Sequence, residues 1–186
     1  MNKRLYLFHD FETGGYENTS ILSYYARITD ENFNKLSELS LFFRPDDKIY
    51  KVEIQALEYN HIDLVAHDKK AKSFTECKNE IEHWLWLWTD SGMNKLWIGG
   101  HNVHWDNAQL ESIIGKEMVR KRFHRHLLDT GSLALTLQLK EKLPMNFEIS
   151  LNNLSEYFGV KPRVRHEAEA DVETTIDVLK EMIKAL

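Results

Sequence analysis

The chain has 186 residues, of which 42% are hydrophobic and 28% are charged, and its formal net charge is −5. This size and balance are typical of one globular domain, which we expect to span residues 1–186. The acidic balance excludes a protein that coats nucleic acid through bulk positive charge, but it leaves open an enzyme whose acids hold metal ions.

Alternating apolar residues predict strands in the first third of the chain. Residues 5–8 form an apolar run typical of a buried strand, and it leads into the sequence FHDFETGG. Residues 20–28 and 39–43 alternate apolar and polar side chains, and Pro45 ends the second run. This pattern predicts an antiparallel hairpin beside the first strand. A helix is expected over residues 51–59.

The stretch 74–89 predicts a longer helix with several tryptophans. Its apolar stripe follows helical spacing and consists of Ile81, Trp84, Leu85 and Trp88. A base-stacking platform is the alternative interpretation, but this spacing favours a buried helix face. Trp86 and Leu87 fall off the stripe, so we expect another element or chain to cover them.

A short apolar run at residues 96–100, closed by two glycines, predicts a central strand, and a helix follows over 107–114. Residues 116–126 carry five Lys or Arg against one Glu. They form either a solvated helix face or a surface that faces phosphates. A short strand at 127–129 and a helix at 132–139 come next.

The last third of the chain predicts helices. Ser150 is the expected N-cap of a helix over residues 151–158, and Gly159 and Pro162 mark the end of that helix. The final helix covers 168–185. The whole order predicts the α/β class, with a mixed sheet of about five strands flanked by helices.

Three acidic segments are candidates for a functional site. Asp10 and Glu12 point the same way from a strand, about 7 Å apart, and repel each other unless a proton or a cation intervenes. Thr13 and the two glycines after it end the strand and allow close backbone approach. Asp106 follows a His-Asn turn at the carboxyl end of a strand, where ligands collect in open α/β sheets.

The third segment contains Asp171, in the first turn of the last helix, and His166 on the loop before it. Each segment alone is compatible with helix capping or a solvated side chain. Together, the order Asp-x-Glu, Asp after His-Asn, and His followed five residues later by Asp resembles the DnaQ-like, or DEDDh, 3′–5′ exonucleases. Residues 128–130, Leu-Asp-Thr, also resemble that family, and residues 7–13 are similar to the start of bacterial exonuclease I.

This resemblance implies a ribonuclease H-like, DnaQ-type exonuclease domain. It implies removal of 5′-mononucleotides from the free 3′ end of single-stranded DNA with two divalent cations. Asp10 would bridge the ions, Glu12 and Asp171 would complete one site, and Asp106 would hold the second. Oxygen ligands favour Mg²⁺ or Mn²⁺ over zinc.

His166, with an ordinary pKa near 6.5, would be the general base. The residues expected to contact the nucleic acid are Thr13, Gly14, His101, Asn102, Arg163 and Arg165.

Two alternatives stay open within this resemblance: an RNA-directed 3′–5′ exonuclease, and a non-catalytic nucleic-acid-binding member of the fold. The sequence identifies no reader of the 2′-hydroxyl and no protein partner. The single cysteine, Cys77, excludes an intrachain disulfide and a cysteine-ligated zinc site, and a zinc site of His101, His104, His124 and His126 is disfavoured. The sequence contains no signal peptide and no apolar run of about 18 residues, which predicts a soluble cytoplasmic protein without membrane contact.

Overall fold

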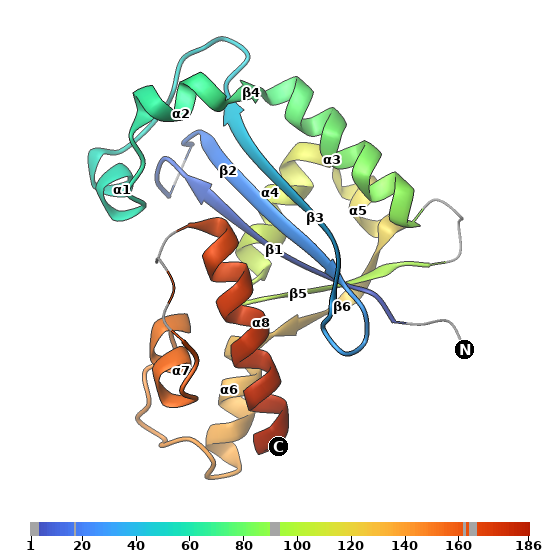
Figure 1. Ribbon diagram of the computed structural model, residues 1–186, viewed down its shortest axis with the longest axis vertical. Coiled ribbons are helices and arrows are strands. Elements are labelled where there is room, and N and C mark those ends of the chain that lie inside the picture. Colours follow the sequence, from blue (N-terminus) through green and yellow to red (C-terminus); the bar gives the residue numbers. More distant parts are fainter. Residues whose placement is uncertain (1–3, 17, 90–93, 162, 164–166) are drawn as a thin grey trace.

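The computed structural model describes residues 4–16, 18–89, 94–161, 163 and 167–186 (Figure 1). Its centre is a six-stranded mixed sheet with the order β4-β3-β2-β1-β5-β6. The strands are β1 (Tyr6–Thr13), β2 (Ile21–Thr29), β3 (Lys35–Arg44), β4 (Lys72–Ser73), β5 (Leu96–Gly100) and β6 (Phe123–Asp129). Strands β1, β2 and β3 pair antiparallel, as the hairpin prediction requires, while β5 pairs parallel with both β1 and β6.

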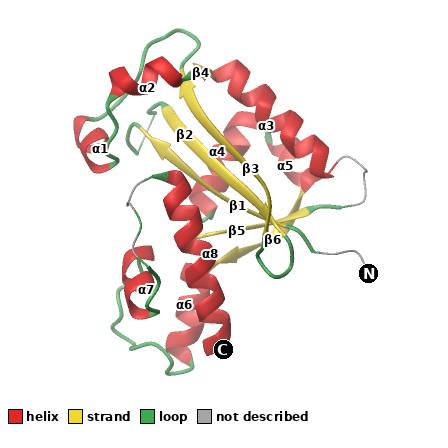
Figure 2. Ribbon diagram, in the orientation of Figure 1, coloured by secondary structure: helices red, strands yellow, loops and turns green. Residues whose placement is uncertain are grey.

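The helices lie on both faces of this sheet (Figure 2). They are α1 (Ile54–Tyr59), α2 (Leu64–Lys70), α3 (Phe74–Thr89), α4 (His104–Ile114), α5 (Lys116–Arg122), α6 (Thr130–Leu139), α7 (Leu151–Tyr157) and α8 (Ala168–Ala185). Leu7, Phe11 and Ile98 pack in one core with α3, α4 and α5. Phe8 points to the other face and packs against Val172 of α8.

Because successive side chains of β1 alternate between these two cores, Asp10 and Glu12 share the α8 face with Phe8. The predicted α/β class and the mixed, helix-flanked sheet are thus confirmed. None of the described helices is long and apolar enough to cross a membrane.

Some short elements were not predicted from the sequence. Helix α2 begins at Asp63, whose carboxylate accepts from the Val65 and Ala66 N–H groups at 2.9 and 3.1 Å. Its one buried residue is His67, so it has no apolar stripe that sequence periodicity detects. Helix α1 corresponds to the helix expected over residues 51–59, but it begins at Ile54. Strand β4 has only two residues, and β6 begins at Phe123 rather than at residue 127.

The tryptophan-rich helix α3 is a core helix, as its spacing predicts. Ile81 and Leu85 are fully buried, and the Trp84 indole donates to Ser37 Oγ at 2.9 Å. Trp86 and Leu87 are 47% and 60% exposed in the described structure. The apolar stripe therefore packs on the sheet, as expected of a buried helix face rather than a base-stacking platform.

The basic segment 116–126 forms helix α5 and the start of β6, and it is not one continuous phosphate-facing surface. Arg122 is 6% exposed, and its guanidinium donates to Thr89 Oγ1 and Met118 Sδ. The segment leads into the amino end of β6, which pairs parallel with β5, whereas the acidic residues follow the carboxyl ends of β1 and β5. The grouping of Arg122 with the exposed basic residues was therefore wrong, because its side chain fills the gap between α3 and α5.

Candidate active site

The site begins where β1 extends past its neighbour β5. Strand β1 pairs with β2 as far as Thr13, but its pairing with β5 stops at Phe8 opposite Gly99. Beyond that point the β5 side of β1 has lost its partner strand. The Phe11 N–H on this open edge donates to Asp106 Oδ1 at 3.0 Å. The early end of β5 thus brings α4, and with it Asp106, beside the end of β1.

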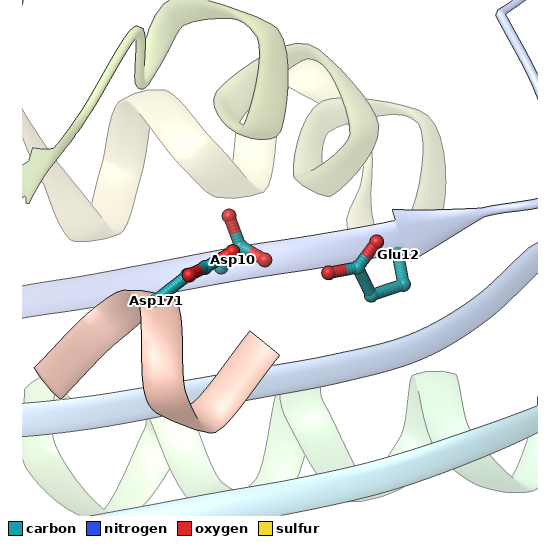
Figure 3. Close-up of side chains that lie close together, drawn as sticks. All are labelled: Asp10, Glu12 and Asp171. Atoms are coloured by element: carbon teal, nitrogen blue, oxygen red, sulfur yellow. The ribbon is translucent and has the colours of Figure 1, made fainter. Parts of the chain in front are cut away.

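Three other carboxylates meet on the α8 side of the sheet (Figure 3). Asp10 and Glu12 extend from β1 and Asp171 from the first turn of α8, and one oxygen of each lies within 4.8 Å of the others. Helix α8 is fixed here because Ala168 and Val172 pack against Phe8 in one core cluster. The structure therefore brings together two segments that are about 160 positions apart in the sequence.

Asp129 holds the helix that carries Asp106, and its importance was missed in the sequence. It is the last residue of β6, and its Oδ2 accepts from the Val103 N–H at 2.9 Å. Its Oδ1 accepts from the Ser132 N–H at 2.8 Å, so one carboxylate caps both α4 and α6. The signal in the sequence is an Asp before Thr-Gly-Ser at a helix start, which predicts one cap and not the second.

Burial and mutual repulsion disfavour the charged state of these acids. Burial first, and then the charges of Asp171 and Asp106, raise the pKa of Glu12 from 4.5 to about 8. The pKa of Asp10 is raised well above its ordinary value, first by burial and then by the charges of Asp106, Glu12 and Asp171. Burial raises the pKa of Asp106 to about 7, and the Phe11 N–H opposes this shift. A cation at this point would remove the repulsion.

The donor set fits a hard divalent cation. All the clustered ligand atoms of Asp10, Glu12 and Asp171 are carboxylate oxygens, which Mg²⁺, Mn²⁺ and Ca²⁺ prefer. In the described structure no other group of acids, histidines or cysteines meets in this way.

The remaining predicted site residues surround these acids in different ways. His101 Nδ1 lies 2.8 Å from Thr130 Oγ1, and burial lowers the pKa of His101. Asn102 forms the turn before α4 and has a left-handed φ of 52°. Thr13 is buried, and its hydroxyl donates to the Gly15 carbonyl at 2.7 Å.

The structure explains the glycine at position 14 by a contact within the chain rather than by the predicted contact with nucleic acid. A Cβ at this position would lie 2.7 Å from the Lys51 carbonyl oxygen and 2.7 Å from Val52 Cγ1. The Glu53 N–H also donates to the Gly14 carbonyl at 2.7 Å. The close approach at Gly14 is therefore made by the chain's own segment 51–53, which leads into α1.

Two cavities flank Glu12. One, of about 660 Å³, lies between the end of β1, helix α1 and the start of α4, with Tyr16, Tyr59 and Trp105 in its wall. The other, of about 360 Å³, is lined by His61, Lys70 and the first residues of α8. Neither cavity is predicted from the sequence, because α1 and α2 lie beside β1 only in the folded chain.

Arg163 is paired with acids of α8. Its guanidinium donates to Glu173 Oε2 at 3.1 Å and to Asp177 Oδ2 at 2.6 Å, and Glu173 also accepts from Arg27 at 2.6 Å. Arg163 is thus placed to anchor the chain to α8, and its predicted contact with nucleic acid stays a prediction. The predicted residues His166 and Arg165 lie outside the described residues.

No family model and no curated protein sequence matches the chain significantly. Solved structures do match it. E. coli exonuclease I in complex with a 5cy-dT13 oligonucleotide has a TM-score of 0.79 at 19% identity, covering 98% of this chain and 41% of that one. The complex with a dT13 oligonucleotide has a TM-score of 0.70 at 19% identity and covers 97% and 41%. The zinc-bound form of an E. coli exonuclease I complex with single-stranded DNA has a TM-score of 0.71 at 20% identity and covers 98% and 41%.

These matches show the fold. The mixed sheet with its flanking helices is the ribonuclease H-like exonuclease fold that exonuclease I has. The chain spans about two fifths of the length of these structures, since it covers 41% of each.

Proposed function

We propose that this chain is a metal-dependent 3′–5′ exonuclease that hydrolyses single-stranded DNA from its 3′ end and releases 5′-mononucleotides. The observation that carries the proposal is the convergence of Asp10, Glu12 and Asp171 within 4.8 Å, with Asp106 bound to the backbone of the same strand. The shared fold supports it, because the E. coli exonuclease I structures of this fold are complexes with DNA oligonucleotides.

Each acid has a role in the proposed site. Asp10, Glu12 and Asp171 would hold one Mg²⁺ or Mn²⁺ ion, and Asp10 and Asp106 would hold a second. When bound, two such ions supply a nucleophile from water and stabilise the departing 3′ oxygen. The raised pKa values of Glu12 and Asp106 mean that the site gives up protons as it takes up cations. The Phe11 N–H donates to Asp106 Oδ1, and Asp129 accepts from the Val103 N–H just before α4, the helix that carries Asp106.

His166 is the proposed proton acceptor. It lies five residues before Asp171 in the sequence, the spacing that the DnaQ-like exonucleases show between this histidine and the last aspartate. An imidazole with an ordinary pKa near 6.5 is neutral and able to accept a proton at pH 7.5.

The larger cavity beside Glu12 is the proposed place of the 3′-terminal nucleotide. Its volume of about 660 Å³ lies in the usual range for small-ligand sites, about 300–1,000 Å³. The rings of Tyr59 and Trp105 in its wall offer apolar surface to a base, while Glu12 at its inner end belongs to the acidic cluster.

The proposal is tested with a 5′-labelled 20-nucleotide DNA, its RNA counterpart and a circular single-stranded DNA. With Mg²⁺ or Mn²⁺ we expect a ladder that shortens the linear DNA from its 3′ end. EDTA, a 3′-phosphate or an inverted 3′ nucleotide should stop it. The control is Asp10→Asn, which keeps the size of the side chain and removes its charge.

The other outcomes have definite meanings. Faster shortening of the RNA would assign the chain to exoribonucleases. Cleavage of the circle would mark an endonuclease and contradict the proposal, as would full activity after exhaustive chelation.

A further inference from the structure

A cluster of basic residues lies at β6, the edge strand of the sheet, and takes no part in the proposed site. We call it the β6-edge cluster. It consists of His124, Arg125 and His126 of β6 together with Arg4 and Lys95, which precede β1 and β5. The β5–β6 pairing runs from Leu96 opposite Phe123 to Ile98 opposite Leu127. One residue of β5 therefore faces three of β6, and this β-bulge contains His124, Arg125 and His126.

Ring stacking and hydrogen bonds hold the cluster in place. The His124 and Trp97 rings stack with centroids 4.2 Å apart and an interplanar angle of 24°. The Arg4 guanidinium lies 5.1 Å from the centroid of the Trp97 ring, in cation–π contact. Lys95 Nζ donates to the Arg120 carbonyl at 2.6 Å, which fixes it at the end of α5. The cations are thus positioned before any ligand arrives.

Nothing in the described structure neutralises this charge. Arg4, Lys95 and Arg125 are exposed and form no ion pair with any described acid, whereas Arg27 and Arg163 both pair with Glu173. The pKa of His124 is lowered, by burial first and then by the positive charges of Lys95, Arg4 and His126. A protein with a net charge of −5 therefore carries a local positive surface at this edge.

We propose that the β6-edge cluster binds the phosphate backbone of a single nucleic-acid strand, at a distance from the candidate active site. The cluster flanks Leu96 and Phe123 at the amino ends of β5 and β6. Asp106 instead follows the carboxyl end of β5, and Asp10 and Glu12 lie in the carboxyl half of β1. It therefore contacts a part of the strand away from the 3′ terminus. This inference rests on the proposed function only in that the function supplies such a strand.

The bulge decides between two kinds of partner. An exposed edge strand can accept a peptide as an additional strand, but the extra residues of β6 break the ladder that such pairing needs. Cations held on and around an aromatic ring match the alternating phosphates and bases of a single strand instead. Protection of the edge against pairing with another copy is the competing explanation for the charges.

The test is the salt dependence of binding, measured without turnover. Fluorescence anisotropy of labelled dT20 is recorded in EDTA at pH 6.5 between 50 and 300 mM KCl for three proteins. These are the wild type, R4Q/K95Q/R125Q and the control K48Q/K140Q/K142Q. The control removes the same charge from exposed lysines elsewhere, so bulk electrostatics change equally. A labelled glutamate decamer is titrated in parallel.

Since each phosphate contact to a single strand contributes about 0.7 to the slope of log K against log[salt], the cluster variant should lose about 2 from the slope. The control should keep the wild-type slope. Equal losses in both variants, or none in the cluster variant, overturn the proposal. Loss of decamer binding with unchanged dT20 binding would assign the surface to an acidic protein, and self-association of the cluster variant with an unchanged slope would assign it to edge protection.

Failure of the proposed function gives a different result. A wild type that binds dT20 with the expected slope but never shortens it with Mg²⁺ present refutes the exonuclease and leaves the cluster assignment standing.

Discussion

Replacing Glu12 by glutamine should stabilise the metal-free protein, and increasingly so as the pH rises. The pKa of Glu12 is raised by burial from 4.5 to about 8, so the folded protein holds this proton more tightly than the unfolded chain does. Folding stability from this group is therefore full below pH 4.5 and is lost as the pH rises towards 8. Glutamine keeps the size of the side chain and does not titrate.

The size of this change in the free energy of unfolding follows from the pH interval over which it is measured. Between pH 5.5 and 7.5 the unfolded carboxyl is ionised and the folded one is still protonated for the most part. Each pH unit then lowers the free energy of unfolding by about 1.36 kcal/mol, which gives about 2.7 kcal/mol over two units. For a chain of this length, about 2–4 °C per kcal/mol converts this to about 5–11 °C in Tm.

The assay is thermal unfolding in EDTA at pH 5.5, 6.5 and 7.5 for the wild type and Glu12→Gln. The difference between their Tm values should widen by about 5–11 °C over this range. Burial lowers the pKa of His9 to about 3, which gives stability the opposite pH dependence, but both proteins carry His9 and its effect cancels in the difference. Glu156→Gln, on the exposed surface of α7, is the control and should differ from the wild type by a constant amount.

At pH 7.5 Mg²⁺ should make the Tm of the wild type higher than that of Glu12→Gln, because the wild type gains binding energy that the variant has lost. A Tm difference in EDTA that stays constant from pH 5.5 to 7.5 would refute the reasoning that burial and crowding of acids destabilise the metal-free site.

Three further predictions concern single residues. Asp129→Ala removes caps from both α4 and α6, so it should lower the free energy of unfolding by about 1–4 kcal/mol and reduce turnover. The control Asp63→Ala uncaps α2 alone and should keep turnover. Equal effects of the two substitutions on turnover would contradict the role of Asp129. Gly14→Ala should destabilise by about 1–3 kcal/mol in urea unfolding, because its Cβ meets segment 51–53; wild-type stability would contradict that close contact. His166→Ala should lower turnover by about 10²–10⁴-fold and flatten the rise of rate between pH 6 and 7.5, with metal affinity by calorimetry nearly unchanged. Much weaker metal binding with an unchanged pH profile would make His166 a ligand instead.

Local sequence patterns were sufficient to predict the elements that have a clear apolar period. Alternation gave the hairpin of β2 and β3, and helical spacing gave the buried stripe of α3, because periods of two and 3.6 residues are properties of the local backbone. The order and spacing of Asp10, Glu12, Asp106 and Asp171 resemble those of the DnaQ-like exonucleases, and this resemblance implies that the four acids share one site. Helix α2 was not predicted, because His67 is its one buried residue and it has no apolar stripe.

The tertiary structure decided what each side chain meets. Asp106 reaches Phe11 because β5 ends before β1 does, and strand length relative to a neighbour is not encoded in either strand alone. Arg122 and Arg163 look like exposed basic residues in the sequence, yet one is buried against Thr89 and the other is paired with acids of α8. Arg125, in the bulge of β6, is exposed and forms no ion pair with an acid of the described residues. In each case the partner comes from a distant part of the chain, and only the packing of the elements specifies it.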